Sequence, residues 1–473
     1  MSNPSLFHRV ALSFSGLGLA LLLLATASVT PAVALDGAST SLKTEVAVAD
    51  TPMSSDLAAQ AVRFKDSPVL KPVIVRFKPQ ALANLNWGAD AVAGFAGGEK
   101  RKVLPLIHGV AMRLPYNSLL AVAKLPEIAW ISPDRQLAAV WDQDVEALGA
   151  DQAWTSVRSP GNVNTDGNGI GVAILDSGVD HTHPDFSGNS GPRVIAFHDF
   201  VNSYAMPYDD NGHGTHVAGI VAGNGSSSNL LFQGVAPKAN LIALKVLDHQ
   251  GRGTASAVLS ALDWCVQNKS FFGIRVLNLS LGHDVVESNV TDPLCVAVRA
   301  CVQAGLVVVC SAGNKGKNLQ GTLVYGGIST PGNDPSVITV GAANTLETVP
   351  RSNDVVTTYS SRGPTAINQF AKPDVVAPGN KIVSLRSVGS YLDNNYPGNR
   401  VPGYADYFLL SGTSMAAPQV AGAAALMLQA NPNLSVNAVK GILMFTAQDI
   451  HPRDSQGNEL HPGLKSLTQG AGA

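Results

Sequence analysis

Charged residues are scarce in this chain, and neither sign dominates. Only 14% of its 473 residues are charged, the formal net charge is −2, and 45% of the residues are hydrophobic. There is therefore no basic excess to attract nucleic acid, and no acidic run. The 46 glycines and 28 prolines are typical of a loop-rich α/β protein.

Cysteine is also rare, with Cys265, Cys295, Cys301 and Cys310 as the only four. Their spacing does not match a zinc-binding pattern. Cys295 and Cys301 fall on one expected helix and point to different faces, so they should not pair with each other. Cys310 ends an apolar run and suits a plain buried thiol. A bridge between Cys265 and Cys301 stays open if the protein is exported.

The first 34 residues predict a secretory signal peptide. His8 and Arg9 precede an apolar stretch over residues 17–25, and Ala32-Val33-Ala34 supplies a small-residue cleavage site. We therefore expect a secreted, extracellular protein that keeps no membrane attachment after cleavage. The alternative is an uncleaved anchor, which the small and polar residues at 26–31 disfavour.

Residues 35–140 predict a small α+β domain. Its start, to about residue 66, is rich in Ala, Ser and Thr and is expected to be flexible. Strands are expected at 73–77, 110–114 and 128–131, and helices within 81–96 and at 119–125. These elements are interpreted as a β-α-β-β-α-β pattern, which needs one strand more than the three named.

Residues 141–473 predict a larger α/β domain with a mostly parallel central sheet and helices on both faces. Buried strands are expected at 171–175, 241–246, 275–281, 306–310 and 337–340, with amphipathic helices between them at 255–267 and 294–304. A further helix is expected at 435–446. In such sheets the active groups belong at the carboxyl ends of the strands.

Three polar residues occupy positions suited to nucleophilic catalysis. Ser414 follows a small-residue turn at the start of an apolar helix, where backbone N–H groups favour negative charge. Asp176 lies at the exit of a buried strand, and His213 stands between two glycines. A nucleophilic serine needs a base and a group that orients that base. Taken singly, each residue is also compatible with a helix cap or a turn.

The segments DSGVD, NGHGTHVAG and GTSMAAPQVAG resemble, in order, the three signature motifs of the subtilisin-like serine proteases. The resemblance implies that Ser414 is the nucleophile, His213 the general base and acid, and Asp176 the residue that holds the imidazole tautomer. It also implies that Asn314, after a buried strand, supplies the oxyanion hole together with the backbone N–H of Ser414. His216 is expected to be structural.

Further segments resemble the substrate cleft of this family. The implied substrate-binding residues are Gly251, Gly253, Ser280, Leu281, Gly282, Ser311, Ala312, Gly313 and Ser329. An extended peptide would pair with the glycine-rich edge through backbone hydrogen bonds. No acidic residue stands at Ser280, Ser311 or Ser329, which favours a broad neutral or apolar preference. The loop at 387–407 is expected to rim the cleft.

Residues 128–135 resemble the closing segment of subtilase propeptides. The resemblance implies that residues 35–140 first assist folding and then inhibit, with their C-terminal tail lying in the cleft. Self-cleavage would fall between residues 137 and 143. The peptidase domain would then be residues 141–473.

No cofactor is expected for the chemistry, but subtilases often bind structural calcium. His183-Pro184-Asp185 resembles a segment that supplies one calcium ligand, so Asp185 is a candidate. The partner loop at 224–233 carries no carboxylate.

The sequence thus predicts a secreted, monomeric serine endopeptidase, made as a self-processing zymogen, that hydrolyses polypeptides through an acyl-enzyme and binds no nucleic acid. One alternative is an inactive homologue that binds peptides, which the complete set of catalytic residues disfavours. The other is a serine esterase or lipase. Its usual G-x-S-x-G elbow is absent, because Ala416 stands at the last position.

Overall fold

The computed structural model describes residues 51–79, 85–139, 154, 164–188, 191–346, 348, 351–450, 452 and 459–473. The predicted signal peptide lies outside these residues. So do residues 140–143 of the predicted cleavage region.

The first sheet is antiparallel and has the strand order β2-β3-β1-β4. Its strands are β1 (Leu70–Phe77), β2 (Glu99–Leu104), β3 (Gly109–Pro115) and β4 (Ile128–Pro133). Helices α3 (Leu85–Ala96) and α4 (Tyr116–Ala123) connect them in the expected β-α-β-β-α-β order. Helix α4 begins three residues earlier than predicted, directly after Pro115.

The start of this region differs from its predicted flexibility. Residues Ser55–Arg63 form helix α2, with Leu57, Ala58 and Ala61 buried. These apolar residues share one helix face, and alanine favours helix, so the alanine-rich composition indicated the wrong state here.

The two faces of the first sheet bury different side chains. Val73 and Val75 of β1 pack with the helices of their own region, whereas Ile74 between them joins a cluster from α7 (Ala255–Phe272) and α8 (Pro293–Gln303). Successive strand side chains point to opposite faces, so β1 serves both cores.

The central sheet has eight strands. Its order is β16-β15-β14-β12-β6-β10-β9, with β17 paired to β15, and all pairs are parallel except β15–β16. The strands are β6 (Gly171–Asp176), β9 (Val194–Asp199), β10 (Asn240–Lys245), β12 (Ile274–Leu279), β14 (Val307–Ser311), β15 (Ile338–Asn344), β16 (Val355–Val356) and β17 (Val375–Pro378). The predicted mostly parallel sheet is therefore confirmed.

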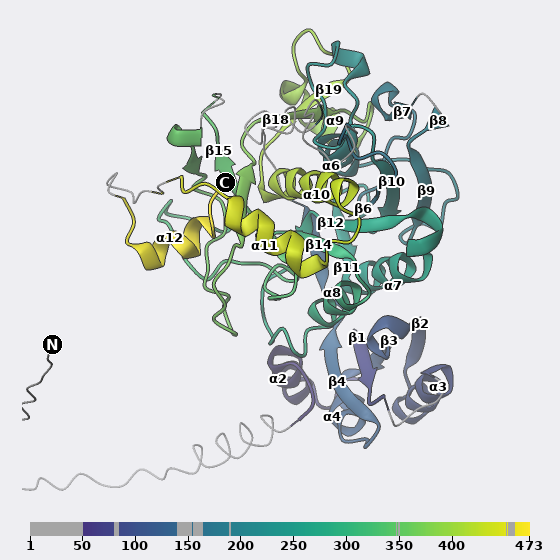
Figure 1. Cartoon of the computed structure of the whole chain (residues 1–473). Helices are drawn as coiled ribbons and strands as arrows, with labels where there is room; N and C mark the ends of the chain where they lie inside the picture. Colours follow the sequence, from purple (N-terminus) through teal and green to yellow (C-terminus); the bar gives the residue numbers. More distant parts are fainter. Residues whose placement is uncertain are drawn as a thin grey trace, which may run out of the picture. The chain divides into compact units, whose positions relative to one another are not determined.

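Helices cover both faces of this sheet (Figure 1). Val172 and Ile174 of β6 pack with α6 (His213–Ala222) and α10 (Thr413–Ala430). Ala173 and Leu175 pack with α7 and α8 on the other face. Because all of β6 is buried, its sequence is continuously apolar up to Asp176.

Shorter elements complete the described chain. They are β5 (Gln136–Ala139), β7 (Ser187–Gly188), β8 (Gly191–Pro192), β11 (Arg252–Thr254), β13 (Leu281–Gly282), β18 (Ile382–Leu385), α9 (Tyr391–Asn395), β19 (Tyr407–Leu410), α11 (Val436–Thr446) and α12 (Pro462–Gln469). Helix α11 confirms the helix predicted at 435–446. Ser435 caps it by accepting a hydrogen bond from the Ala438 N–H.

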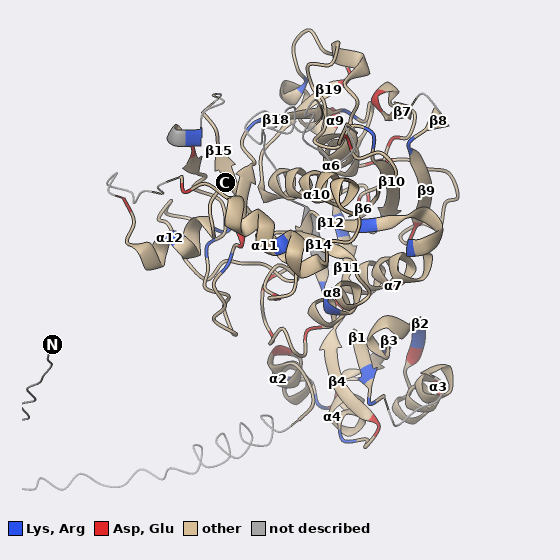
Figure 2. Ribbon diagram, viewed as in Figure 1, with Lys and Arg blue, Asp and Glu red and all other residues tan. Residues whose placement is uncertain are grey.

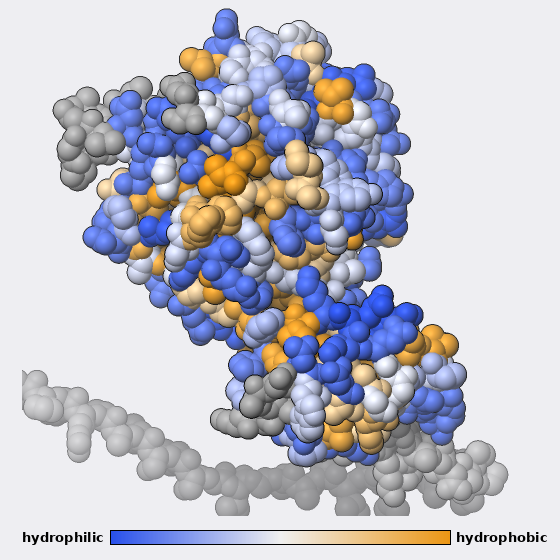
Figure 3. Space-filling model, turned by 90° about the vertical axis from the view of Figure 1, so that its right-hand side faces the viewer, coloured by the Kyte–Doolittle hydropathy of each residue, from blue (hydrophilic) through white to orange (hydrophobic). Residues whose placement is uncertain are grey.

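Charged residues are thinly spread over the ribbon, as the composition requires (Figure 2). Hydrophobic and hydrophilic side chains both reach the face shown in Figure 3. None of the described helices is long and apolar enough to cross a membrane.

All four cysteines are buried free thiols. The Cys265–Cys301 bridge left open by the sequence is therefore not formed, although the helices that carry the two residues, α7 and α8, contact each other. Burial raises the pKa of each thiol.

Candidate active site

Asp176 and His213 meet at the carboxyl end of the central sheet. Asp176 is the last residue of β6, and His213 is the first residue of α6. The Nδ1 of His213 lies 2.6 Å from Oδ1 of Asp176, and both side chains are buried. Gly212, with φ of 103°, forms the tight turn that starts the helix. This contact fixes which ring nitrogen faces the carboxylate.

Asp209 holds the loop that presents His213, a role the sequence analysis missed. Its buried carboxylate accepts hydrogen bonds from the Ser177 hydroxyl at 2.8 Å, the Gly212 N–H at 2.8 Å, and the N–H and hydroxyl of Thr215 at 2.8 and 2.6 Å. These donors come from both sides of the Asp176–His213 pair. An Asx-type turn before the NGHGTH motif was the available signal.

Ser414 is the second residue of α10 and is fully buried. Its hydroxyl donates to the Ser280 carbonyl at 2.9 Å, and the Ser280 hydroxyl donates to the Ser414 carbonyl at 2.7 Å. Helix α10 packs against α6, which carries His213. The fold therefore gathers the three predicted triad residues from β6, α6 and α10.

Asn314 is anchored through its amide oxygen. That oxygen accepts from the Thr413 N–H at 3.1 Å and from the Thr413 hydroxyl at 2.8 Å. The Thr413 hydroxyl also accepts from the Gly313 N–H at 3.1 Å. Both hydrogen bonds use the oxygen of the Asn314 side chain, so its amide nitrogen can donate to another group. Thr413 directly precedes Ser414 in the chain, so the Asn314 side chain is held next to the start of α10. Thr413 is thus a second positioning residue that the sequence analysis missed.

His216 is structural, as expected. Its Nε2 lies 3.1 Å from the carbonyls of Ile382 and Phe408. The pKa of His216 is lowered to about 3, mainly because the ring is completely buried and, to a smaller extent, because His213 is nearby. Burial therefore favours the neutral form of this ring.

Several of the predicted cleft residues contact one another, and Ser280 contacts Ser414 directly. Gly282 approaches Ser329 and Thr330 so closely that a Cβ on it would lie 2.5 Å from the Thr330 carbonyl oxygen. Gly313, with φ of 97°, likewise faces the Ser329 hydroxyl, and Ser329 N–H donates to the Ala312 carbonyl at 2.9 Å. Ser311 ends β14, and Gly251 forms the turn that precedes β11.

The tail of the N-terminal region lies in this cleft. Strand β5 runs antiparallel between β11 and β13, pairing Leu137 with Gly253 and Ala139 with Leu281. Along β13, this tail runs from Gly282 towards Leu281 and hence towards Ser280, whose carbonyl accepts the Ser414 hydroxyl. The tail therefore approaches Ser414 as a β-paired peptide.

Asp185 does not fit a calcium ligand. Its carboxylate is buried and accepts four hydrogen bonds, from the Gly225 N–H at 3.1 Å, the Ser226 hydroxyl at 3.0 Å, the Ser227 N–H at 2.8 Å and the Tyr407 hydroxyl at 2.6 Å. Donor hydrogens occupy the directions in which a cation would bind. Within the described ranges, no group of three or more His, Cys, Asp or Glu residues could hold a metal ion.

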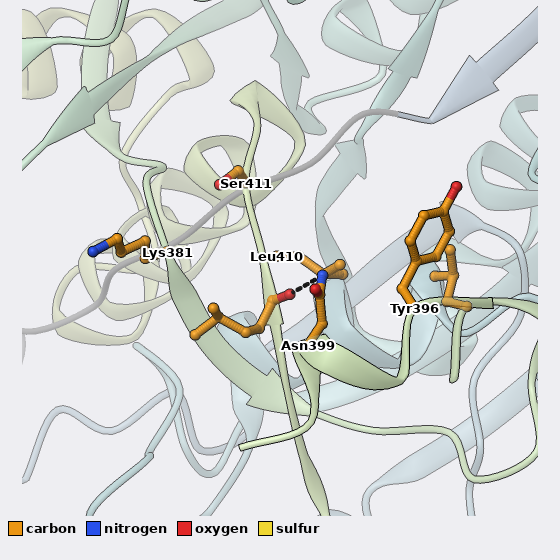
Figure 4. A pocket seen from close by; sticks show the side chains of 7 residues that line it. Lys381, Tyr396, Asn399, Leu410 and Ser411 are labelled. Carbon is orange, nitrogen blue, oxygen red and sulfur yellow. Dashed lines mark hydrogen bonds between the residues drawn. The ribbon is translucent and has the colours of Figure 1, made fainter. Parts of the chain in front are cut away.

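The loop at 387–407 lies beside the loop that presents His213. The Tyr391 N–H donates to the Asp210 carbonyl at 2.8 Å, and the Leu392 N–H donates to the Asn211 carbonyl at 3.0 Å. A cavity of about 390 Å³ lies between this loop and the strand leading to Ser414 (Figure 4). It is lined by Lys381, Leu392, Tyr396, Asn399, Leu409, Leu410 and Ser411. None of these residues was predicted to be catalytic or to bind substrate.

A family model, several known proteins and a solved structure are similar to this chain. A model of the subtilase family matches residues 167–466. Serine protease AprX of Bacillus subtilis is 43% identical over 315 residues, which are 66% of this chain and 67% of that protein. Subtilisin E of Bacillus subtilis is 32% identical over 397 residues, 83% of this chain and 89% of its own. A solved cold-adapted subtilisin-like serine proteinase is 32% identical, with a TM-score of 0.46, and the match covers 62% of this chain and 88% of that one.

The parallel sheet with a serine, a histidine and an aspartate gathered at its carboxyl end defines a serine protease of the subtilisin type. The chain belongs to the subtilase family, whose model covers most of its length. It is a serine endopeptidase that acts on polypeptides.

Proposed function

We propose that this protein is a secreted subtilase made as a self-processing zymogen, with a broad preference for neutral or apolar side chains. The observation that carries the zymogen proposal is the strand β5, which lies between β11 and β13 and leads towards Ser414. A region that ends in its own enzyme's cleft is placed to be cut there and then to inhibit.

The proposed chemistry begins with Ser414. Its hydroxyl oxygen attacks the peptide carbonyl carbon while His213 takes the proton. Asp176, 2.6 Å from Nδ1, holds the imidazole and stabilises the imidazolium that forms. His213 then gives the proton to the leaving amine, and an acyl group remains on Ser414. Water, deprotonated by the same histidine, releases the acyl group and restores the enzyme.

The negative oxygen of the tetrahedral intermediate needs donors fixed in advance. Asn314 offers its amide nitrogen, because its oxygen is occupied by Thr413. The backbone N–H of Ser414, at the start of α10, is the second proposed donor. We propose no cofactor for any of these steps.

Side-chain contacts between the prosegment and the peptidase support inhibition after cleavage. The carboxylate of Asp134 accepts hydrogen bonds from the N–H of Ser256, at 2.9 Å, and from the hydroxyl of the same residue. Ser256 lies in the first turn of α7. Glu287, itself buried, accepts from Trp130 at 2.8 Å and Ser132 at 3.0 Å and forms an ion pair with Arg135 at 3.2 Å. Hydrogen-bonded contacts of this kind would hold the cut prosegment in place.

Expression of the full chain and of its Ser414→Ala variant tests self-processing. The wild type should yield a shorter product that begins between residues 138 and 143, whereas the variant should keep the prosegment. Equal processing of the two proteins would show that another protease makes the cut. Digestion of casein without comparable ester hydrolysis would set aside the esterase alternative.

Secretion and specificity have tests of their own. The exported chain of the Ser414→Ala variant should begin after residue 34, and an unshortened membrane-bound chain would contradict the signal-peptide proposal. Sequencing of fragments from a peptide mixture should show neutral or apolar residues before the cut bonds. A requirement for Lys or Arg there would contradict the proposed preference.

A further inference from the structure

A buried lysine, Lys245, lies beside Asp176 in the neighbouring strand of the central sheet. Lys245 ends β10, and its parallel partner in β6 is Asp176. Its side chain is fully buried, and its Nζ donates to the Ser177 carbonyl at 2.6 Å and to Oδ1 of Asp210 at 2.5 Å. The ammonium also lies 4.8 Å from the ring centre of Tyr208. A charge placed in such a site needs a partner, and Asp210 is that partner.

The ion pair joins the two segments that carry Asp176 and His213. Ser177 follows Asp176 directly, and its N–H donates to the same carboxylate oxygen that faces His213, at 2.8 Å. Asp210 lies three residues before His213 in the loop held by Asp209. Through these two contacts, Lys245 connects the aspartate side of the pair to the histidine side.

We propose that Lys245 and Asp210 are positioning residues whose opposite charges fix this junction and balance the electrostatic environment of His213. The proposal rests on the proposed role of His213 as the base. Neither residue touches the reacting atoms. Each acts through the segments it holds and through its charge.

The balance of charge gives the proposal a specific signature. If Asp210 loses its charge, the Lys245 ammonium is uncompensated and disfavours a protonated His213. If Lys245 loses its charge, the Asp210 carboxylate is uncompensated and favours a protonated His213. The second effect should be smaller, because the Asp210 side chain is 36% exposed and solvent screens it.

The other charged or titratable groups near this junction stay the same in both variants. They are Asp176, Asp199, Tyr208, Asp209, His216, His249, Arg386 and Asp393. A change in the pH profile is therefore attributable to the pair.

The test compares Asp210→Asn, Lys245→Met and the double variant as mature enzymes cut from the full chain. The measured quantity is the acidic limb of kcat/KM on a neutral peptide substrate, which reports the base in the free enzyme. We expect Asp210→Asn to move this limb to lower pH by about 0.3–1 unit. Lys245→Met should move it to higher pH by less, and the double variant should return it close to the wild-type position.

A merely structural role would lower kcat or thermal stability without moving the limb in opposite directions. Unmoved limbs, or shifts of the same sign in both single variants, would overturn the proposal. If Lys245→Met does not fold, the direction of the shift in Asp210→Asn still decides. A wild type without peptidase activity would instead overturn the proposed function, so the two failures are distinguishable.

Discussion

At the scale of single residues, the carboxamide of Asn314 is oriented before substrate arrives, because Thr413 holds its oxygen through two hydrogen bonds. Asn314→Leu removes the donor and keeps a similar volume. We expect kcat to fall about 100- to 1000-fold, as for the equivalent amide in subtilisin, with a much smaller change in KM. Steady-state kinetics on a peptide substrate check this.

Thr413→Val is the matched control for Asn314, since it keeps the amide but removes the hydroxyl that orients it. Its loss of kcat should be smaller than that of Asn314→Leu. If the Asn314→Leu variant kept the kcat of the wild type, Asn314 would not be part of the oxyanion hole.

His216 should make the folded state sensitive to acid. Its pKa is lowered by burial to about 3, against 6.5 in an unperturbed chain, so the unfolded state binds the proton first. The stability contributed by the neutral ring is thus fully present above about pH 6.5 and is lost as pH falls towards 3. The expected slope is up to about 1.4 kcal/mol per pH unit.

Urea unfolding of the Ser414→Ala protein at several pH values measures this slope without self-digestion. Adding His216→Gln, which is uncharged at every pH, should flatten the slope between pH 6 and 4. An unchanged slope would show that other groups cause the sensitivity to acid.

At the scale of elements, Asp185 ties three segments together by hydrogen bonds rather than by a metal ion. It links its own turn to the loop at 225–227 and to Tyr407 of β19. Tyr407→Phe removes one bond to a buried carboxylate and should lower the free energy of unfolding by about 1–3 kcal/mol. Thermal unfolding in the Ser414→Ala background gives the value.

Thermal unfolding in the presence of a chelator tests whether Asp185 binds calcium. The effect of EDTA on the melting temperature should be the same in the Asp185→Asn variant and in the protein that keeps Asp185. A chelator effect that disappears with Asp185→Asn would return calcium to this residue.

Glu287 joins the proposed prosegment to the rest of the chain through contacts with Trp130, Ser132 and Arg135. Glu287→Ala leaves Arg135 with one fewer partner. The affinity of the mature enzyme for the cut prosegment should then fall by at least about 30-fold. The full chain should then show a shorter lag before activity appears, with unchanged kcat/KM of the mature enzyme. Asp284→Asn, an exposed acid three residues away, is the control. Equal lags in the two variants would contradict the anchoring role of Glu287.

At the scale of the whole molecule, the parts predicted from sequence were those that one segment encodes alone. The strand ending at Asp176 is apolar up to that residue because both its faces are buried. Its position could therefore be predicted from the run of apolar residues alone. Three motifs with fixed spacing identified the residues that the fold then gathers. Helix α2 was missed because an alanine-rich composition suits both a flexible segment and a helix, and burial of Leu57 decides between them.

The roles of Asp209, Lys245 and Asp185 could not be predicted in the same way. Each depends on which donors or charges distant segments bring to it. Lys245 stood inside a strand correctly predicted as buried, yet its partners, Ser177 and Asp210, lie 68 and 35 positions away. Asp185 resembled a calcium ligand by its neighbours in sequence, whereas Tyr407, 222 positions away, occupies one of its lone pairs.

The central claim is that Ser414 forms the acyl-enzyme. The most direct measurement is mass spectrometry of peptides from the enzyme after reaction with a sulfonyl fluoride, which modifies an activated serine. We predict one modification, on Ser414, that appears in step with the loss of peptidase activity and is abolished by His213→Ala. A modification on another residue, or full activity in an enzyme modified at Ser414, would contradict this account.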